Sequence, residues 1–176
     1  MNLENGIATW GNGESLAVRK DFHSKAERGD VIAQTVLGIM HRLGVGVARD
    51  YKEAFKWFWL AANQGNPSAQ NNLGVMYVDG EGGRPDKSNS AKWFRLSADQ
   101  GNATAQLNLG AMYADGSGVP HDNITAHMWC SISAANGCNE AKTYRDFLAE
   151  KMTPDEISEA QRRFRRHVAF KYQKIL

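Results

Sequence analysis

The chain has 176 residues, 42% of them hydrophobic and 23% charged, with a formal net charge of +2 at pH 7. This length and composition indicate an ordinary globular domain with a core, and the near-neutral charge favours no class of charged partner. No run reaches the roughly 18 consecutive apolar residues of a membrane span. The first residues, MNLENGIATWGNG, lack the basic and apolar regions of a signal peptide, so we expect a cytoplasmic protein or the mature form of an exported one.

A repeat of 36 residues dominates the sequence. Residues 30–65, 66–101 and 102–137 align without a gap, and 11 positions are identical in all three. Phe22, Ala26 and Gly29 precede Phe58, Ala62 and Gly65 by one period, and Ala141 follows Ala105 by one period. We therefore expect one domain over 1–176: a degenerate unit at 1–29, the three repeats, a partial unit at 138–152 and a capping helix at 153–174.

Each repeat predicts two helices joined by a glycine-rich turn. In the second repeat, Ala69, Leu73 and Tyr77 share one helical face. After the turn, three- and four-residue steps again connect Ser90, Trp93, Phe94, Ser97 and Ala98. The predicted caps are Asn66 and Asn102 for the first helices and Asp50, Asp86 and Asp122 for the second, with Gly65, Gly101 and Gly137 at the corners between repeats. Gly38, Gly74 and Gly110 fall inside helices, which predicts a close approach of two helices without room for a Cβ.

The repeats resemble a known family. They follow the pattern AxxxLGxxYxxGxGVxxDxxxAxxWxxxAAxxGN, which is similar to that of bacterial Sel1-like repeat proteins, although His41 replaces the usual Tyr and GGRPD lacks the usual Val. The resemblance implies an all-α fold: a right-handed α/α superhelix, or solenoid, of about five helix hairpins with a C-terminal capping helix, related to tetratricopeptide repeats. It also implies a protein-protein interaction scaffold, and the segment after Met1 resembles the start of mature exported members, which favours a periplasmic or secreted protein.

The resemblance implies a binding surface on the concave side, which the first helix of each unit lines. A protein or peptide is the expected partner, and helical spacing assigns three positions of each repeat to this face. The alternative is that these side chains only pack against a neighbouring helix. The predicted residues are Thr35, Ile39, Arg42, Asn71, Val75, Val78, Leu107, Ala111 and Ala114.

The two cysteines, Cys130 and Cys138, are eight residues apart. A cysteine-rich branch of the family pairs cysteines at this spacing, but here Cys130 is in phase with Phe58 and Phe94, inside a predicted helix. Two helical turns place the Cα atoms about 9–12 Å apart, too far for a disulfide. We expect a buried thiol at Cys130 and no disulfide. The spacing of these cysteines with His121 and His127 fits no standard zinc pattern, so no metal site is predicted.

The C-terminal segment predicts an amphipathic helix. Thr153, Pro154 and Glu156 form a capping box, and the apolar stripe comprises Ile157, Ala160, Phe164, Val168 and Tyr172. From Lys151 onward the formal charge is +4, with a basic patch at Arg162, Arg163 and Arg166. We expect a helix that seals the end of the array behind a solvated basic face. The alternative is a regulator that binds an acidic partner or nucleic acid through this helix.

No catalytic constellation is evident, because the five histidines are scattered and the glycine-rich loops recur at the turn of each repeat. We predict a non-catalytic scaffold without a cofactor, and expect no nucleic acid partner. The cysteine-rich branch of the family is linked to β-lactam binding, which leaves a small-molecule binder or an enzyme as a further alternative. The identity of the partner and the oligomeric state stay open.

Overall fold

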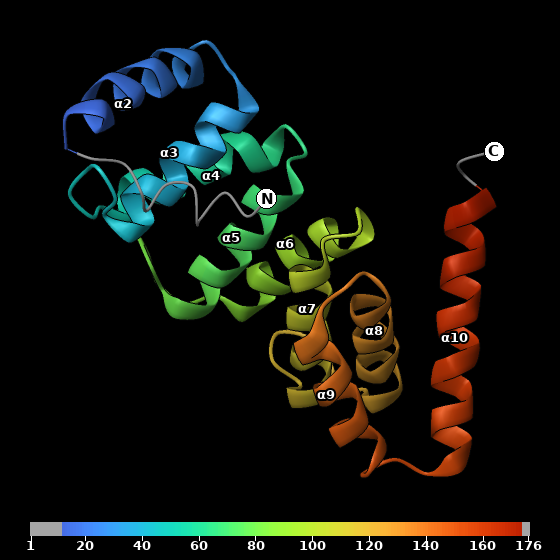
Figure 1. The fold of residues 1–176 in the computed structure, drawn as a ribbon. Coiled ribbons are helices and arrows are strands. Elements are labelled where there is room, and N and C mark those ends of the chain that lie inside the picture. Colours follow the sequence, from blue (N-terminus) through green and yellow to red (C-terminus); the bar gives the residue numbers. More distant parts are fainter. Residues whose placement is uncertain (1–11, 174–176) are drawn as a thin grey trace. The chain divides into compact units, whose positions relative to one another are not determined.

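The computed structural model describes residues 12–173, with the backbone alone for residues 12–19 and 171–172. Within 12–173 the chain forms nine helices and no strand, as the all-α prediction requires (Figure 1). The helices are α2 (Asn12–Glu27), α3 (Val31–Leu43), α4 (Tyr51–Asn63), α5 (Pro67–Asp79), α6 (Lys87–Asp99), α7 (Ala103–Asp115), α8 (Asn123–Ala135), α9 (Asn139–Ala149) and α10 (Pro154–Gln173). The first 11 residues of the predicted N-terminal unit and Lys174 at the end of the predicted capping helix lie outside the described residues.

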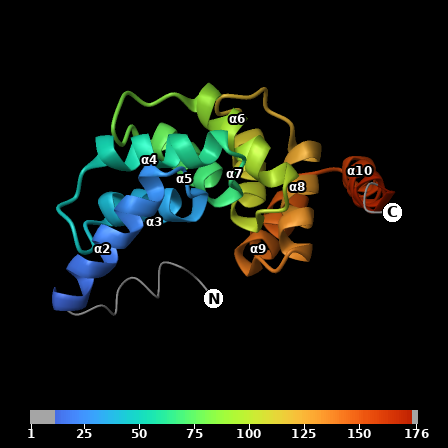
Figure 2. The same cartoon turned by 90° about the horizontal axis from the view of Figure 1, so that it is seen from above.

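The chain divides into two compact units between Asp86 and Lys87. In the first unit α3 packs against α2 and α4, and α4 packs against α5 (Figure 2). In the second unit α7 packs against α6 and α8, and α8 also packs against α9 and α10. Each unit therefore has its own core of sequential helix pairs. The largest fully buried apolar side chains are Leu37, Met40, Phe58, Leu73 and Met76 in the first unit, and Leu109, Trp129 and Cys130 in the second.

Side chains at equivalent places in the repeats fix where the helices begin. Asn66 and Asn102 each accept a hydrogen bond of 2.9 Å from the backbone N–H three residues later, and so cap α5 and α7. Asp50 and Asp122 cap α4 and α8 in the same way. The predicted caps at these four positions are confirmed, and each such cap stabilises its helix by about 1 kcal/mol.

The chain turns from one repeat into the next at a glycine with left-handed backbone. The φ angles are 91° at Gly65, 99° at Gly101 and 94° at Gly137. A residue with a Cβ is strained at these angles, which explains why glycine recurs at this place and confirms the predicted corners.

A buried glutamine lies five residues after Gly29, Gly65 and Gly101 and ties the helix that follows each glycine to the helix before it. We call Gln34, Gln70 and Gln106 the corner glutamines; all three are buried. The side-chain N–H of each donates to a carbonyl oxygen eight residues earlier, in Ala26, Ala62 and Ala98, at 2.9–3.1 Å. The amide oxygens of Gln34 and Gln106 also accept from Gln64 at 2.7 Å and from Asn136 at 2.8 Å, respectively. Each of these carbonyl oxygens also accepts from the backbone N–H of the glycine three residues later, so the glutamine supplies a second hydrogen bond at the helix end.

The glycines inside the first helices lie where helices approach closely. A Cβ built on Gly38 would lie 2.6 Å from two ring carbons of Phe58. One built on Gly110 would lie 2.8 Å from Sγ of Cys130 and 3.2 Å from the carbonyl oxygen of Ala126. These distances are too short for ordinary contact, so the predicted close approach is confirmed at both positions.

We expect Gly38→Ala to lower the free energy of unfolding by up to about 2 kcal/mol. Alanine gains about 1 kcal/mol of helix propensity over glycine, but overpacking a filled core costs about 1–3 kcal/mol or more. Phe58 is fully buried and has little room to move. Urea unfolding followed by circular dichroism measures the change. Gly83→Ala is the control, because no atom lies within 4 Å of a Cβ built there; equal losses in the two variants would contradict the overpacking argument.

Candidate functional site

A groove of about 660 Å³ lies between α7 and α9, which both pack against α8. These helices are the first helix of the third repeat and the helix of the partial unit that follows it. The groove is lined by Leu107 and Ala111 of α7 and by Glu140, Thr143, Tyr144 and Phe147 of α9. Two predicted concave-face residues are therefore part of an actual groove.

The α9 wall of the groove is aromatic. The rings of Tyr144 and Phe147 stack with their centroids 6.1 Å apart and their planes at 24°. Phe147 is 46% exposed, and the Nζ atom of Lys151 lies 4.0 Å from the centroid of its ring. Burial, together with the nearby Asp115 and Cys130, raises the pKa of Tyr144, so its hydroxyl is protonated at neutral pH. Such a surface offers apolar contact to a partner.

Glu140 is the one charged side chain among the described residues that line this groove. Hydrogen bonds from its own backbone N–H and from the Cys138 thiol hold its pKa below the ordinary value. The carboxylate is therefore negative at neutral pH. An apolar segment that carries a basic residue would complement a groove with this charge.

Thr143 and Phe147 were not among the predicted residues, although the repeat contains a signal for them. They follow Leu107 and Ala111 by one period of 36 residues. The partial unit keeps few of the residues identical in the three repeats, so its helix was not assigned to the binding face. Extending the register by one more step would have identified both positions.

The predicted concave-face residues of the first unit do not line this groove. Thr35 and Ile39 are buried, and the Thr35 hydroxyl donates to the carbonyl oxygen of Val31 at 2.8 Å. Asn71 and Val75 are half-buried on α5, and Val78 is 38% exposed. Helical spacing alone did not separate the buried side chains of α3 from the accessible ones. In the second unit, the remaining predicted residue, Ala114, is half-buried against the core.

Arg42 is held by contacts within the first unit. Its Nε atom donates to Glu81 at 2.6 Å, and an Nη atom donates to the amide oxygen of Asn72 at 3.3 Å. The side chains of Arg42 and Glu81 are only 21% and 19% exposed. This ion pair joins the end of α3 to the turn after α5, so Arg42 is engaged inside the protein rather than free for a partner.

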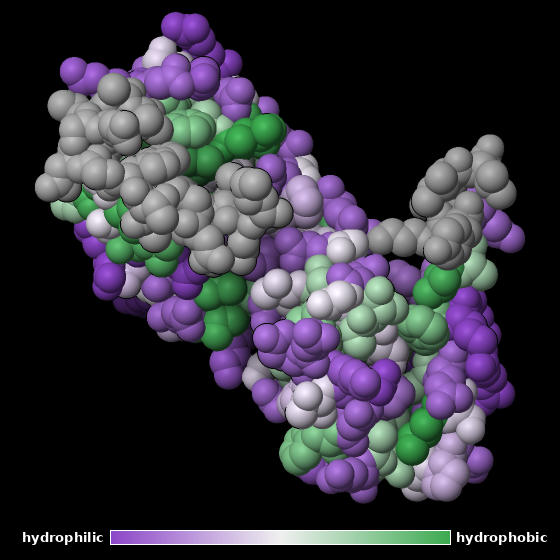
Figure 3. Space-filling view, in the orientation of Figure 1, coloured by the Kyte–Doolittle hydropathy of each residue, from purple (hydrophilic) through white to green (hydrophobic). Residues whose placement is uncertain are grey.

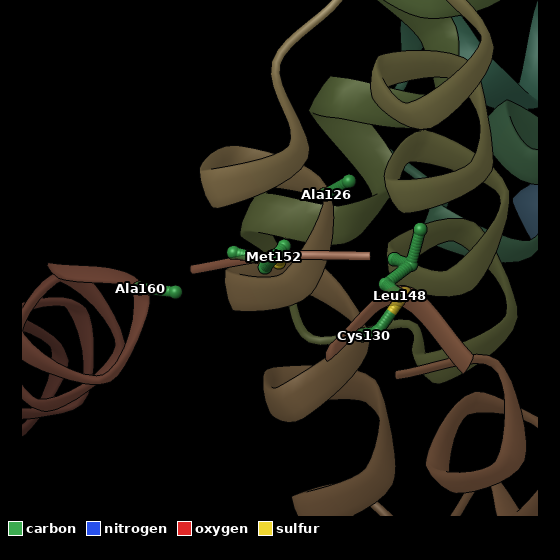
Figure 4. Close-up of a cluster of buried hydrophobic side chains, with 5 residues drawn as sticks. All are labelled: Ala126, Cys130, Leu148, Met152 and Ala160. Atoms are coloured by element: carbon green, nitrogen blue, oxygen red, sulfur yellow. The ribbon is translucent and has the colours of Figure 1, made fainter. Parts of the chain in front are cut away.

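The apolar side of α10 packs on α8, and its Ala160 belongs to a cluster that also includes Leu148 of α9. Ala160 is fully buried and points toward Met152 in a cluster with Ala126, Cys130 and Leu148 (Figure 4). Hydrophobic side chains follow α10 on the side toward α8, and hydrophilic ones cover its outer side (Figure 3). The predicted stripe at Ile157, Ala160, Phe164 and Val168 is at least half-buried, and the side chain of Tyr172 lies outside the described residues.

The predicted capping box at the start of α10 is confirmed. Glu156 accepts from the backbone N–H and the hydroxyl of Thr153 at 2.8 and 2.9 Å, and the N–H of Glu156 donates back to the Thr153 hydroxyl at 3.3 Å. The two bonds from Thr153 lower the pKa of Glu156. The helix therefore begins at a defined residue, which fixes the register of the side chains that follow.

Two of the three predicted basic-patch residues pair with carboxylates of the protein. Arg162 and Arg163 each lie 3.0 Å from Glu159, and Arg163 also lies 3.4 Å from Asp122. Hydrogen bonding from Arg163 is the main reason that the pKa of Glu159 is lowered. Arg166 is exposed and forms no ion pair with a described carboxylate. The patch is thus largely neutralised at two of its three positions.

Asp122 caps α8 and forms an ion pair with Arg163 of α10. We expect this carboxylate to make the stability of the fold depend on pH. Burial raises its pKa, but bonds from the Thr125 hydroxyl and backbone N–H and the charge of Arg163 outweigh burial, so the pKa is lowered. The carboxylate therefore stabilises the fold above its unfolded pKa, near 3.8, and this contribution is lost as pH falls through the lower folded pKa.

We expect Asp122→Asn to reduce stability by about 0.5–1 kcal/mol at neutral pH, and the loss to shrink as pH falls below the unfolded pKa near 3.8 and through the lower folded pKa, where the wild-type carboxyl also becomes protonated. Urea unfolding at neutral pH and along this acid range measures the change. Asp99→Asn, at an exposed position on α6, should not reproduce the pH dependence. A loss for Asp122→Asn that persisted unchanged at low pH would contradict this role.

The two cysteines are free thiols in different environments. Cys130 is fully buried, as predicted, and burial raises its pKa to about 12. Cys138 is half-buried and donates to Glu140 at 3.3 Å. Cys130 is therefore a core residue without the thiolate character that reactivity requires. Among the described residues, no three His, Cys, Asp or Glu side chains gather as a metal site would need.

None of the described helices is both long enough and apolar enough to cross a membrane.

Comparisons with known proteins agree with this arrangement. The family model for the Sel1 repeat matches residues 31–66, 67–102 and 103–138. The chain is 37% identical to the Sel1 repeat protein from Oxalobacter formigenes, with a TM-score of 0.66 over 72% of this chain and 96% of that one. It is 34% identical to c5321, a protective antigen of uropathogenic Escherichia coli strains displaying an SLR fold, with a TM-score of 0.66 over 80% of this chain and 34% of c5321. No curated protein sequence matches. The likenesses confirm the all-α solenoid as the fold class.

Proposed function

Because the chain belongs to the Sel1 repeat family, whose members are generally scaffolds for protein interaction, we propose that it is a non-catalytic scaffold that binds a peptide or protein segment in the groove between α7 and α9. The observation that carries this proposal is the groove itself. It is concave, largely apolar, and walled on one side by the exposed ring of Phe147. Grooves between the helices of stacked repeats are surfaces on which such arrays bind their partners.

The chemistry of the groove defines the kind of segment that fits. A volume of about 660 Å³ holds several side chains, and Leu107, Ala111 and Phe147 supply apolar contact. Glu140 at the start of α9 complements a lysine or arginine of the segment. We therefore propose an apolar segment, extended or helical, that carries at least one basic residue.

Packing of the walls favours binding without a large entropic cost. α7 and α9 are both held against α8, and Tyr144 and Phe147 stack on one another. Side chains that are ordered before binding lose less conformational freedom when the partner arrives. A few central contacts then account for most of the affinity, as is usual for interfaces with an aromatic anchor.

The test is a selection of peptides from a display library on the purified full-length chain, followed by affinity measurements on variants. We expect the selected peptides to contain apolar residues and a basic residue, and Phe147→Glu and Ala111→Glu each to weaken their binding about 30-fold or more. Leu96→Glu is the matched control, because Leu96 is 48% exposed and lies outside the groove. Thermal unfolding establishes that all variants are folded.

Selected peptides that bind Phe147→Glu as tightly as the wild type would exclude the groove as the binding site. Weakening by Leu96→Glu to the same extent would do the same.

A further inference from the structure

Four helices of the second unit meet at a pocket of about 470 Å³ that shares no residue with the groove between α7 and α9. Its walls include Arg95 of α6, Tyr113 of α7, Trp129 of α8, and Arg163, Arg166 and Phe170 of α10. Three of these side chains carry a positive charge. No Asp or Glu is among the described residues that line the pocket.

Arg95 is positioned by aromatic rings and keeps its charge unneutralised. Its guanidinium carbon lies 5.1 Å from the ring centroid of Trp129 and 5.5 Å from that of Tyr113, and it donates to the Tyr113 hydroxyl at 2.5 Å. Stacking on rings orients a guanidinium but supplies no counter-charge. Arg95 forms no ion pair with any described carboxylate, so most of its N–H groups stay available to a ligand.

The two arginines of α10 contribute in different ways. Arg163 is already engaged by Asp122 and Glu159. Arg166 lies three residues further along the same helix, is exposed, and forms no ion pair with a described carboxylate. Two guanidinium groups that form no ion pair with a described carboxylate, Arg95 from α6 and Arg166 from α10, therefore line one small pocket.

The rest of the lining is apolar or aromatic. The indole of Trp129 is 1% exposed, and its Nε1–H has no hydrogen-bond acceptor among the described residues. Met128 lies beside it in the lining, and Phe170 at the rim is 58% exposed. A ligand with a charged end and an apolar body would satisfy both kinds of surface.

We propose that this pocket binds an organic oxyanion, with its carboxylate or phosphate group held by Arg95 and Arg166 and its apolar body against Met128 and Phe170. Guanidinium groups match the geometry of both oxyanions and form charge-assisted hydrogen bonds with them. The site depends on the docking of α10, because Arg166 and Phe170 come from that helix.

Titrations of the full-length chain with benzoate and with phenyl phosphate test the proposal, with neutral benzyl alcohol as the reference. The nuclear magnetic resonance shift of the Trp129 indole N–H reports occupancy. We expect either or both oxyanions to shift this resonance, and added salt to weaken the effect. The relative affinities show whether the carboxylate or the phosphate is preferred.

Arg166→Gln should weaken oxyanion binding about tenfold or more, since a charge-assisted hydrogen bond contributes about 1.5–3 kcal/mol. Arg165→Gln is the matched control: it removes the same charge from an exposed position of the same helix that does not line the pocket. The proposal is overturned if neither oxyanion shifts the indole resonance. It is also overturned if benzyl alcohol shifts it equally, or if the two variants bind alike.

Discussion

Trp129→Ala is expected to lower the free energy of unfolding of the second unit by about 3–5 kcal/mol, the largest effect of any single substitution that we predict. Trp129 is 1% exposed on α8. Its ring contacts the imidazole of His167 on α10 edge to face, with centroids 5.2 Å apart, and stacks under Arg95 of α6. Alanine would leave a large cavity at the place where three helices meet.

Chemical unfolding followed by circular dichroism measures the loss. The matched control is Trp93→Ala, at the same position of the preceding repeat and in the same unit but only half-buried. We expect a smaller loss there. Trp129→Phe should also be milder, because the indole N–H makes no hydrogen bond with a described residue. Equal losses for Trp129→Ala and Trp93→Ala would mean that burial of the repeated tryptophan does not determine its contribution.

Gln106→Leu should destabilise the second unit by about 1–3 kcal/mol although leucine is more hydrophobic. Gln106 is fully buried. Its N–H donates to the carbonyl oxygen of Ala98 near the end of α6, and its oxygen accepts from Asn136 at the end of α8. Leucine would remove both bonds, and a hydrogen bond contributes about 0.5–1.5 kcal/mol net. The Ala98 carbonyl keeps its bond from the Gly101 N–H, and Asn136 is exposed to water, so neither partner is left buried and unpaired.

The same unfolding measurement applies, with Gln100→Leu as the control because Gln100 is exposed in the same unit. Surface substitutions of this kind change stability by about 0.5 kcal/mol or less. A double-mutant cycle with Asn136→Ala isolates the coupling across the 2.8 Å bond. If Gln106→Leu proved neutral, the corner glutamines would be replaceable by any side chain of similar volume.

The features that the sequence predicted well are local or periodic. Caps at Asn66 and Asn102 follow from rules that act within a few residues. The close approach at Gly38 and Gly110 was evident because a costly residue recurs at the same phase inside a helix. Because the 36-residue repeat occurs three times, a residue type that recurs at the same position in all three is not expected there by chance.

The features that the sequence did not predict depend on which side chains meet in space. The corner glutamines recur at the same position of the three repeats, but recurrence does not reveal the carbonyl groups to which they donate. Arg95 and Arg166 lie on helices far apart in the chain, and only the docking of α10 brings them to one pocket. The burial of Thr35 and Ile39 likewise depends on packing around α3, which helical periodicity does not specify.

The division between Asp86 and Lys87 falls inside the second repeat, between its two helices. The boundaries of the sequence repeats and the boundary between the two compact units therefore do not coincide. Within each unit the helices pack in chain order, so each core joins helices from more than one repeat. A single 36-residue block therefore holds no complete core of its own.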